Sequence, residues 1–141
     1  MSEFSLHPQL AADGEPVAET SLCLLLMMND ARYPWFVLVP KRAAVRELYE
    51  LPEEDQQQLL HDSSSLGRAL MQAYAGDKLN LAALGNVVPQ LHLHHIVRFQ
   101  HDDAWPAPVW GRHPARPYEA GDRRRQLDRL RPLLDAHWHW R

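Results

Sequence analysis

Short apolar runs separated by turn-like segments mark the beginning of the chain. Leu22 to Met28 and Trp35 to Val39 are apolar runs of strand length, and the NDARYP segment between them contains Asn, Asp and Pro. This pattern predicts two antiparallel strands joined by a longer hairpin loop. The preceding segment, residues 13–16 (DGEP), is typical of a turn.

The middle of the chain has the composition and spacing of helices. Residues 41–49 (KRAAVRELY) are rich in helix formers, and a better helix begins at Pro52, where three acidic residues follow the proline and complement the helix dipole. Apolar residues then recur at three- and four-residue steps, as Leu59, Leu60, Leu66, Leu70, Met71 and Tyr74. One apolar face is therefore predicted, with Gly76 as a plausible end of the helix.

The second half predicts two more strands and one more helix. Residues 79–84 and 89–99 have strand patterns, with Gly85 and Asn86 between them as a turn or bulge. Residues 101–117 are proline-rich and predict a loop that Trp105 and Trp110 hold on the surface. Residues 122–134 predict an amphipathic helix with Leu127, Leu130 and Leu134 on one side, and Pro132 argues against its continuing to the end.

This order of elements predicts an α+β fold. Strands precede and follow the long helix, so we expect an antiparallel sheet of about five strands, one long helix and a C-terminal helix. The 141 residues suit one domain, residues 1–141. Its core would comprise about residues 20–100, and residues 101–141 would form the C-terminal loop and helix.

Composition and charge set the expected partners and compartment. The formal net charge of −3 gives no basic field, so nucleic acid is not expected as the main partner. The single cysteine, Cys23, excludes an internal disulfide and fits a reducing compartment. The N-terminus lacks a signal-peptide pattern, and the longest apolar run is too short to cross a bilayer. We therefore expect a cytoplasmic protein without a membrane partner.

The segment QLHLHHI, residues 90–96, places three of the nine histidines within four positions. Side chains alternate along a strand, so Gln90, His92 and His94 would share one face, and His95 would join the leucines on the core face. An amide and two imidazoles in a row are costly to bury without partners. The pattern therefore predicts that this face lines a pocket, while His95 packs in the core or against a helix.

Imidazoles beside a glycine–asparagine turn suit phosphate chemistry. A neutral imidazole is a good nucleophile near neutral pH, and its attack on phosphorus would give a phosphohistidine-type intermediate. The second imidazole would orient the first or hold its proton. Gly85 allows close approach of the backbone, and Asn86 with the N–H groups of Val87 and Val88 could cradle phosphate oxygens.

Two other interpretations of the histidines stay open at this point. His92 and His94 could be hydrogen-bonded structural residues. A zinc site is the main chemical rival, with ligands drawn from His92, His94, His101, Asp102 and Asp103, although the last three lie beyond the strand end. The tail HWHW, residues 137–140, could also suggest a metal, but packing of its tryptophans is the simpler prediction.

QLHLHHI preceded by LGNVVP resembles the histidine triad (HIT) motif, in which three histidines alternate with apolar residues after a phosphate-binding loop. WFVLVPKR is similar to an upstream strand of that family, and AWPAPVWG resembles a bacterial HIT-like subgroup. The resemblance covers about residues 22–98. It implies a HIT-like fold and a homodimer. It also implies a nucleotide hydrolase or transferase that acts on the α-phosphate of a nucleoside phosphoramidate or dinucleoside polyphosphate.

The resemblance also assigns roles. His92 matches the nucleophile, His94 matches the histidine that supports it, and Gln90 stands where the first triad histidine belongs. The substrate-binding positions that it implies are Asn80, Asn86, Val87 and Val88 around the phosphate, and Asn29 or Asp30 at the ribose. No cofactor or metal is required, although a polyphosphate substrate would bring magnesium.

Departures from the motif, above all the loss of the first histidine and of the loop hydroxyl, motivate a second hypothesis. Gln90 replaces a triad histidine, Val87 replaces the hydroxyl residue that helps to protonate a leaving group, and Trp35 replaces an outlying histidine. These changes affect catalysis more than phosphate binding. The alternative function is therefore a non-catalytic nucleotide-binding or nucleotide-sensing module.

Overall fold

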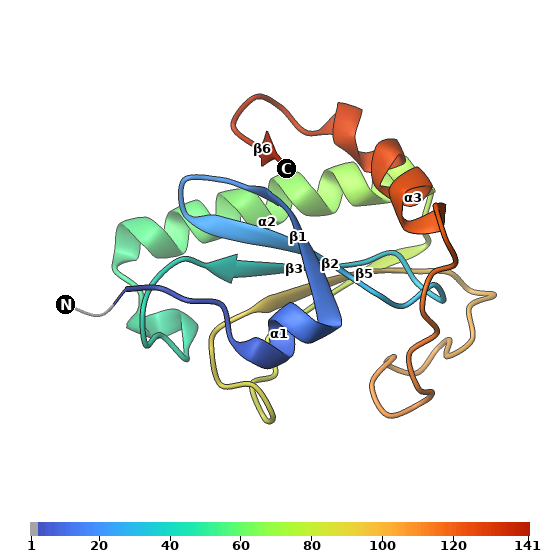
Figure 1. Ribbon diagram of the computed structural model, residues 1–141, viewed down its shortest axis with the longest axis horizontal. Helices are drawn as coiled ribbons and strands as arrows, with labels where there is room; N and C mark the ends of the chain where they lie inside the picture. Colours follow the sequence, from blue (N-terminus) through green and yellow to red (C-terminus); the bar gives the residue numbers. More distant parts are fainter. Residues whose placement is uncertain (1–2) are drawn as a thin grey trace.

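The computed structural model describes residues 3–141 as an antiparallel sheet with a long helix across one face (Figure 1). The six strands are β1 (Gly14–Glu19), β2 (Cys23–Met28), β3 (Trp35–Pro40), β4 (Lys78–Ala82), β5 (Leu93–Arg98) and β6 (His139–Trp140). The helices are α1 (Pro8–Asp13), α2 (Glu53–Tyr74) and α3 (Asp122–Leu130), and η1 (Leu48–Glu50) and η2 (Arg131–Leu133) are 3-10 turns. The sheet order is β4-β5-β3-β2-β1-β6. The α+β prediction is confirmed.

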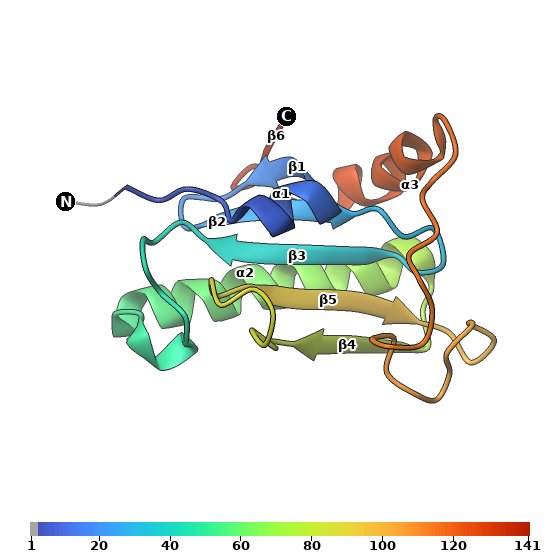
Figure 2. The same ribbon diagram turned by 60° about the horizontal axis from the view of Figure 1, so that its bottom comes forward.

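The central strands are apolar throughout because both of their faces are covered. Leu25 and Phe36 belong to the core under α2, whereas Leu26 and Val37 pack on the opposite face with Leu10 of α1. Figure 2 shows α2 behind the sheet and α1 in front of it. A strand buried on both sides reads as a continuous apolar run, as β2 and β3 do in the sequence.

Helix α2 begins directly after Pro52 and ends close to the predicted glycine. Its last residue is Tyr74, and Ala75 adopts the left-handed conformation with φ of 52°. A Cβ atom at Gly76 would lie 2.3 Å from Cγ1 of Val97 on β5. Gly76 is therefore needed where the chain passes from the helix back to the sheet, because any side chain would collide with β5 there.

Two predicted elements at the N-terminal side are wrong. Residues 14–16 do not form a turn but begin β1, and the register with β2 shifts between Pro16 and Ala18. Proline is tolerated at such a bulge because no ladder hydrogen bond is required from it. Residues 41–49 do not form an α-helix. Lys41 and Arg42 bond instead to Thr20 and Asp55, and Leu48 opens the 3-10 turn η1.

Two strand boundaries also differ from the prediction. The strand expected at 89–99 begins only at Leu93, and the one expected at 79–84 is β4, which ends at Ala82. The residues between Ala82 and Leu93 form an irregular loop. The histidine segment is thus partly loop and partly strand, and Gln90 and His92 precede β5.

The C-terminal part ends its helix as the proline predicts. α3 stops at Leu130, and Pro132 lies in η2. The tail then returns to the sheet, where β6 pairs with β1 and Trp138 is buried. The predicted packing of the tail tryptophans is confirmed. Among the residues that the structure describes, no helix is both long and apolar enough to span a membrane.

Candidate functional site

The three clustered histidines divide between the two faces of the sheet as alternation predicts. His92 and His94 lie on the face away from α2, and each is only 6% exposed. His95 points to the other side, where its Nε2 atom lies 2.7 Å from the Ser63 hydroxyl of α2. Nδ1 of His95 lies 3.1 Å from the Leu93 carbonyl, to which it must donate, so the Ser63 hydroxyl donates to Nε2. His95 is a structural residue that ties β5 to α2.

His92 and His94 line a cavity of about 340 Å³ at the beginning of β5. Its walls come from α1, the end of β2, the start of β3, the loop after β4 and a C-terminal loop. The lining residues are Gln9, Leu10, Asp13, Met28, Trp35, Leu84, Gly85, Asn86, Val87, Val88, His92, His94 and Trp110. Most of the wall is apolar, so the two imidazoles are among the few polar groups that a ligand would meet.

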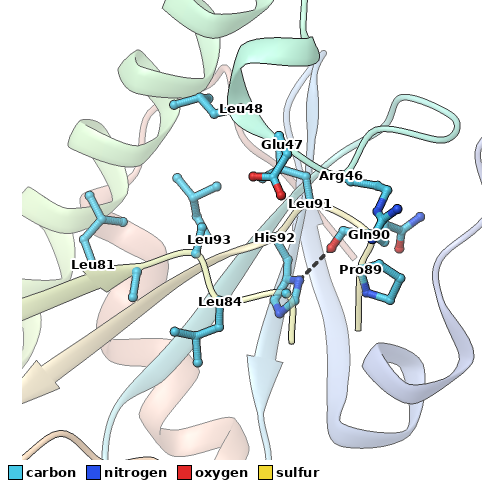
Figure 3. A pocket seen from close by; sticks show the side chains of 13 residues that line it. Arg46, Glu47, Leu48, Leu81, Leu84, Pro89, Gln90, Leu91, His92 and Leu93 are labelled. Atoms are coloured by element: carbon cyan, nitrogen blue, oxygen red, sulfur yellow. Dashed lines mark hydrogen bonds between the residues drawn. The ribbon is translucent and has the colours of Figure 1, made fainter. Parts of the chain in front are cut away.

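A backbone carbonyl fixes the tautomer of His92. Its Nδ1 atom lies 2.7 Å from the carbonyl oxygen of Gln90 (Figure 3). A carbonyl oxygen only accepts, so Nδ1 carries the proton of the neutral ring and the lone pair is on Nε2. A lone pair on Nε2 is what a nucleophilic imidazole needs.

An indole fixes His94 in the opposite way. Nε1 of Trp35 lies 3.0 Å from Nδ1 of His94, and an indole N–H only donates. Nδ1 of His94 is therefore the acceptor, and the proton of the neutral ring is on Nε2. Burial, together with the positive charge that His92 and His95 can carry, lowers the pKa of His94 to about 3. His94 is neutral at physiological pH.

The two rings lie close together and are covered by aromatic side chains. The ring centroids of His92 and His94 are 4.9 Å apart, with an interplanar angle of 70°. Trp35 and Trp110 meet the His94 ring edge to face, at centroid distances of 5.7 and 5.2 Å. Little water can reach His94 between these rings, which explains why burial dominates its pKa.

Two further cavities adjoin the first. One of about 200 Å³ shares Leu84, Gly85 and His92 with it and extends toward Arg46 and Glu47 (Figure 3). The other, of about 370 Å³, shares Asp13, Met28 and Trp35 with the first cavity and contains Asn29 and Asp30. His92 thus lines two adjoining cavities.

The Gln90 side chain is not brought to the histidines, contrary to the expected row of three. Its Oε1 accepts from the backbone N–H of His7 at 2.9 Å, and its Nε2 donates to the Ser5 carbonyl at 2.9 Å. Gln90 lies in the loop before β5, and the N-terminal segment supplies a partner for each end of its side-chain amide. The amide holds the N-terminal segment against the loop.

The predicted phosphate loop reaches the site only in part. Asn86, Val87 and Val88 line the 340 Å³ cavity, called the main cavity below, together with His92. The Val88 side chain is buried in the core beneath, whereas the Val87 side chain is 86% exposed. Asn80 is on the same face of the sheet, but it lies opposite Ile96 and its Oδ1 accepts from Arg98 at 2.8 Å. The structure therefore places Asn80 beside an ion pair and not on the cavity wall.

Asn29 and Asp30 hold the C-terminal segment. Oδ1 of Asn29 accepts from the backbone N–H of Tyr118 at 3.0 Å. Oδ1 of Asp30 accepts from the N–H of Arg32 at 3.0 Å and from that of Arg116 at 3.4 Å. Both residues line the 370 Å³ cavity, so they border the space where the resemblance implies a ribose.

The structure does not assemble the alternative zinc site. Asp102 is paired with Arg98, and Asp103 is paired with Arg32 and Arg116. Within residues 3–141, no three histidine, cysteine or acidic side chains lie together in a way that could hold a metal ion. His92 and His94 thus face the cavity without the acidic partners of that hypothesis.

Sequence reasoning missed the ion pair that positions the C-terminal loop. The Arg98 side chain, 2% exposed, donates to Asp102 through Nε at 2.8 Å and to the Ala107 carbonyl at 2.9 Å. Burial alone would raise the pKa of Asp102, but bonds from Arg98 and from the N–H groups of Phe99, Trp105 and Ala104 lower it well below its usual range. The pair holds the loop that carries Trp110. The sequence signal that could have predicted this ion pair is an arginine at the end of a strand with an aspartate four residues later.

Comparison with known proteins places this geometry in context. The HIT domain model matches residues 9–101. A histidine triad protein from Marinobacter aquaeolei has 53% identity and a TM-score of 0.91, with 94% of this chain and 97% of that chain covered. One from Bradyrhizobium japonicum has 40% identity and a TM-score of 0.92, covering 95% of this chain and 100% of that chain. No curated protein matches.

A more distant structure shares the fold. A protein from Sulfolobus tokodaii that is named as a hypothetical histidine triad nucleotide-binding protein has 16% identity and a TM-score of 0.63. The match covers 82% of this chain and 79% of that chain. The arrangement of the sheet and the long helix is therefore common to both structures.

Proposed function

The chain belongs to the histidine triad (HIT) family, and from that premise we propose that it is a nucleotide-binding hydrolase or transferase. Its reaction would occur at the α-phosphate of a nucleoside phosphoramidate or dinucleoside polyphosphate. The observation that carries this proposal is the bond between Nδ1 of His92 and the Gln90 carbonyl, because it leaves the lone pair on Nε2. The nucleotide-binding name of the distant Sulfolobus tokodaii protein is consistent with the substrate class.

In the proposed reaction, Nε2 of His92 attacks the α-phosphorus and the bond to the leaving group breaks. The product is a nucleotidyl-histidine, which water then hydrolyses to a nucleoside monophosphate and free His92. Positive charge develops on the imidazole during attack, and the Gln90 carbonyl stabilises it through the Nδ1–H bond. Asn86 and the N–H groups of Val87 and Val88 would bind the equatorial phosphate oxygens.

The cavities suggest where the rest of the substrate would lie. The main cavity is apolar and bounded by Trp35 and Trp110, which suits the flat face of a base. Asn29 and Asp30, in the adjoining cavity, would accept ribose hydroxyls. A polyphosphate substrate would bring magnesium with it, but the attack by His92 needs no metal.

A second candidate function is a non-catalytic nucleotide-binding or nucleotide-sensing module. Two observations favour it. Both polar ends of the Gln90 amide are bonded to the N-terminal segment, and residue 87 is an exposed valine with no proton to give. Neither position then supplies an acid for the leaving group, so binding without turnover is the chemical alternative.

The two functions separate in a single-turnover experiment. The protein, in excess, is mixed with adenosine phosphoramidate or with a diadenosine polyphosphate and quenched at short times. We expect AMP to form and an acid-labile adenylyl group to appear on the peptide that contains residue 92. His92→Ala should abolish both signals, whereas His101→Ala, an exposed histidine outside the cavity, should keep them. Binding by wild type without turnover would favour the sensing module.

We also propose a cytoplasmic homodimer. β4 is a sheet edge, and Leu81 on it and Leu84 after it are each about half exposed, at 52% and 48%. Exposed leucines beside an edge strand suit a contact between two copies. Light scattering after gel filtration tests this, with Leu81→Asp expected to shift the protein to monomer and Leu60→Asp, on the exposed side of α2, as the control.

A further inference from the structure

We propose that Trp35 is a positioning residue that holds His94 in one neutral tautomer, with its proton on Nε2. His92 and His94 would then present opposite groups through their Nε2 atoms, a lone pair from His92 and a proton from His94. The tautomer assignment stands on geometry alone, whereas its meaning for catalysis rests on the proposed function.

The sheet register delivers the indole to the imidazole. Trp35 is the first residue of β3 and pairs with Ile96 of β5, while Val37 pairs with His94. Trp35 and His94 are therefore diagonal neighbours on one face, within reach of each other's long side chains. The indole N–H donates to Nδ1 of His94 across 3.0 Å, at a normal hydrogen-bond length.

The donor character of indole couples the tautomer of His94 to its charge. Trp35 has one N–H and no acceptor, so Nδ1 of His94 must keep its lone pair for the bond to exist. A second proton on His94 would have to go to Nδ1, where it would face the indole N–H and break the bond. The indole therefore opposes both the other tautomer and the imidazolium form.

The surroundings act in the same direction. Trp35 and Trp110 both meet the His94 ring edge to face, and the side chain is 6% exposed. The titratable side chains that line this cavity, among the residues described, are Asp13 of α1, His92 and His94 itself. His92 and His95 raise the cost of a positive charge on His94, while Asp13 is the one acidic group of the lining.

This arrangement gives the two histidines different roles. The tautomer of His92 is fixed by a carbonyl that only accepts, and the tautomer of His94 is fixed by an indole that only donates. His94 would donate its Nε2–H to a phosphate oxygen while it stays neutral, and it would not serve as an imidazolium acid. A substitution that removes the indole donor should release this restriction without touching the nucleophile.

The first test needs no substrate and no variant. NMR spectra of the protein labelled with 15N-histidine report the protonation of each ring nitrogen. We expect His94 to show a lone pair on Nδ1 and a proton on Nε2, with His92 in the opposite tautomer, and no protonation of His94 from pH 8 down to about 5, well below the ordinary histidine pKa. A proton on Nδ1 of His94, or its titration near an ordinary histidine pKa, would overturn the inference.

The second test compares the two tryptophans that contact the same ring. Trp35→Phe removes the donor and keeps an aromatic ring, whereas Trp110→Phe changes an indole for which no hydrogen bond to His94 is found among residues 3–141. We expect mixed tautomers and a raised His94 pKa in Trp35→Phe only. Its single-turnover rate should fall further than that of Trp110→Phe as pH decreases below 6.

Each result separates this inference from the proposed function. The stated tautomers in a protein without turnover would contradict the enzymatic proposal and leave the Trp35 assignment standing. Turnover with mixed tautomers in wild type, or equal effects of Trp35→Phe and Trp110→Phe on the pH profile, would overturn the assignment. Should Trp35→Phe fail to fold by circular dichroism, the spectrum of the wild-type protein decides the question.

Discussion

Nδ1 of His92 donates to the main-chain carbonyl of Gln90, two residues before it, and not to the Gln90 side chain. Any residue at position 90 offers the same carbonyl. The orientation of the proposed nucleophile therefore depends on the course of the backbone from residue 90 to 92. The Gln90 amide is engaged elsewhere, with Ser5 and His7.

Gln90→Ala should therefore separate the two duties of this residue. We expect adenylylation of His92 to proceed at close to the wild-type rate, because the carbonyl is retained. The N-terminal segment should become more mobile because both hydrogen bonds of the Gln90 side-chain amide are lost. We expect the free energy of unfolding to decrease by about 1 kcal/mol. Hydrogen exchange at residues 5–7 measures the loosening, and a collapse of the His92 reaction in this variant would show that the amide itself takes part.

Buried neutral histidines should make the protein less stable in mild acid. Burial lowers the pKa of His94 to about 3 and that of His95 to about 4, so neither takes up a proton in the folded state near pH 5. The unfolded chain binds these protons below an ordinary histidine pKa of about 6.5. Stability is thus complete above that pH and decreases as pH falls, with a slope of about 1.4 kcal/mol per pH unit for each group.

Urea unfolding between pH 7.5 and 4.5 measures this slope. His95→Gln should reduce it by the share of one histidine, while His101→Ala, at an exposed position, should leave it unchanged. An unchanged slope in His95→Gln would mean that His95 does not stay neutral in the folded protein.

The C-terminal tail should be held most firmly at low pH. His137 lies between two carboxylates, with Nε2 2.9 Å from buried Asp62 and Nδ1 3.1 Å from Asp135. Burial works to lower the pKa of His137, but the hydrogen bonds and charges of the two aspartates outweigh it and raise the pKa. A raised pKa means that this stabilisation is complete below about pH 6.5 and is lost as pH rises through the folded-state value.

His137→Gln should cost about 1 kcal/mol of stability at pH 6 and much less at pH 9. His139→Ala is the matched control, since this exposed residue belongs to the same tail. Chemical unfolding of both variants at the two pH values makes the comparison. Equal losses for His137→Gln at pH 6 and 9 would argue against a charge-dependent contact.

Removing one partner of the Arg98–Asp102 pair should lower the free energy of unfolding more than replacing both partners by apolar residues. Both side chains are almost fully buried, at 2% and 3% exposure, so removing one partner leaves an uncompensated charge. Arg98→Met should destabilise the protein by about 3 kcal/mol, and the double variant Arg98→Met with Asp102→Leu should lose less. Thermal unfolding measures the stabilities, and tryptophan fluorescence reports whether the loop with Trp110 has moved. A double variant that is worse than the single one would contradict a purely electrostatic cost.

Periodicity predicted the parts of the structure that depend on local pattern. Strand alternation separated His94 from His95, and proline positions marked the start of α2 and the end of α3. The failures have a common cause. Residues 14–16 contain turn formers, but pairing with β2 makes them a strand, because tertiary contacts override local propensity.

The candidate site was predictable only where its residues are close in sequence. His94 is in β5 and His92 precedes it by two residues, and both line the same cavity. Trp35 and Trp110 come from distant segments, and their contacts with His94 depend on the β3–β5 register and on the loop held by Arg98. The periodicity of one segment does not predict contacts between distant segments. The hydrogen bonds of the Gln90 side chain with residues 5 and 7 could not be predicted for the same reason.

The pairing of Val37 with His94 and of Phe36 with His95 has a consequence for how the molecule is made. A slip of one residue in this ladder would send the helix-facing imidazole into the cavity and bury the other beneath α2. The cavity-facing histidine is therefore in place only when β3 and β5, nearly sixty positions apart in sequence, pair in the correct register. The onset of nucleotide binding during refolding would report when this pairing forms.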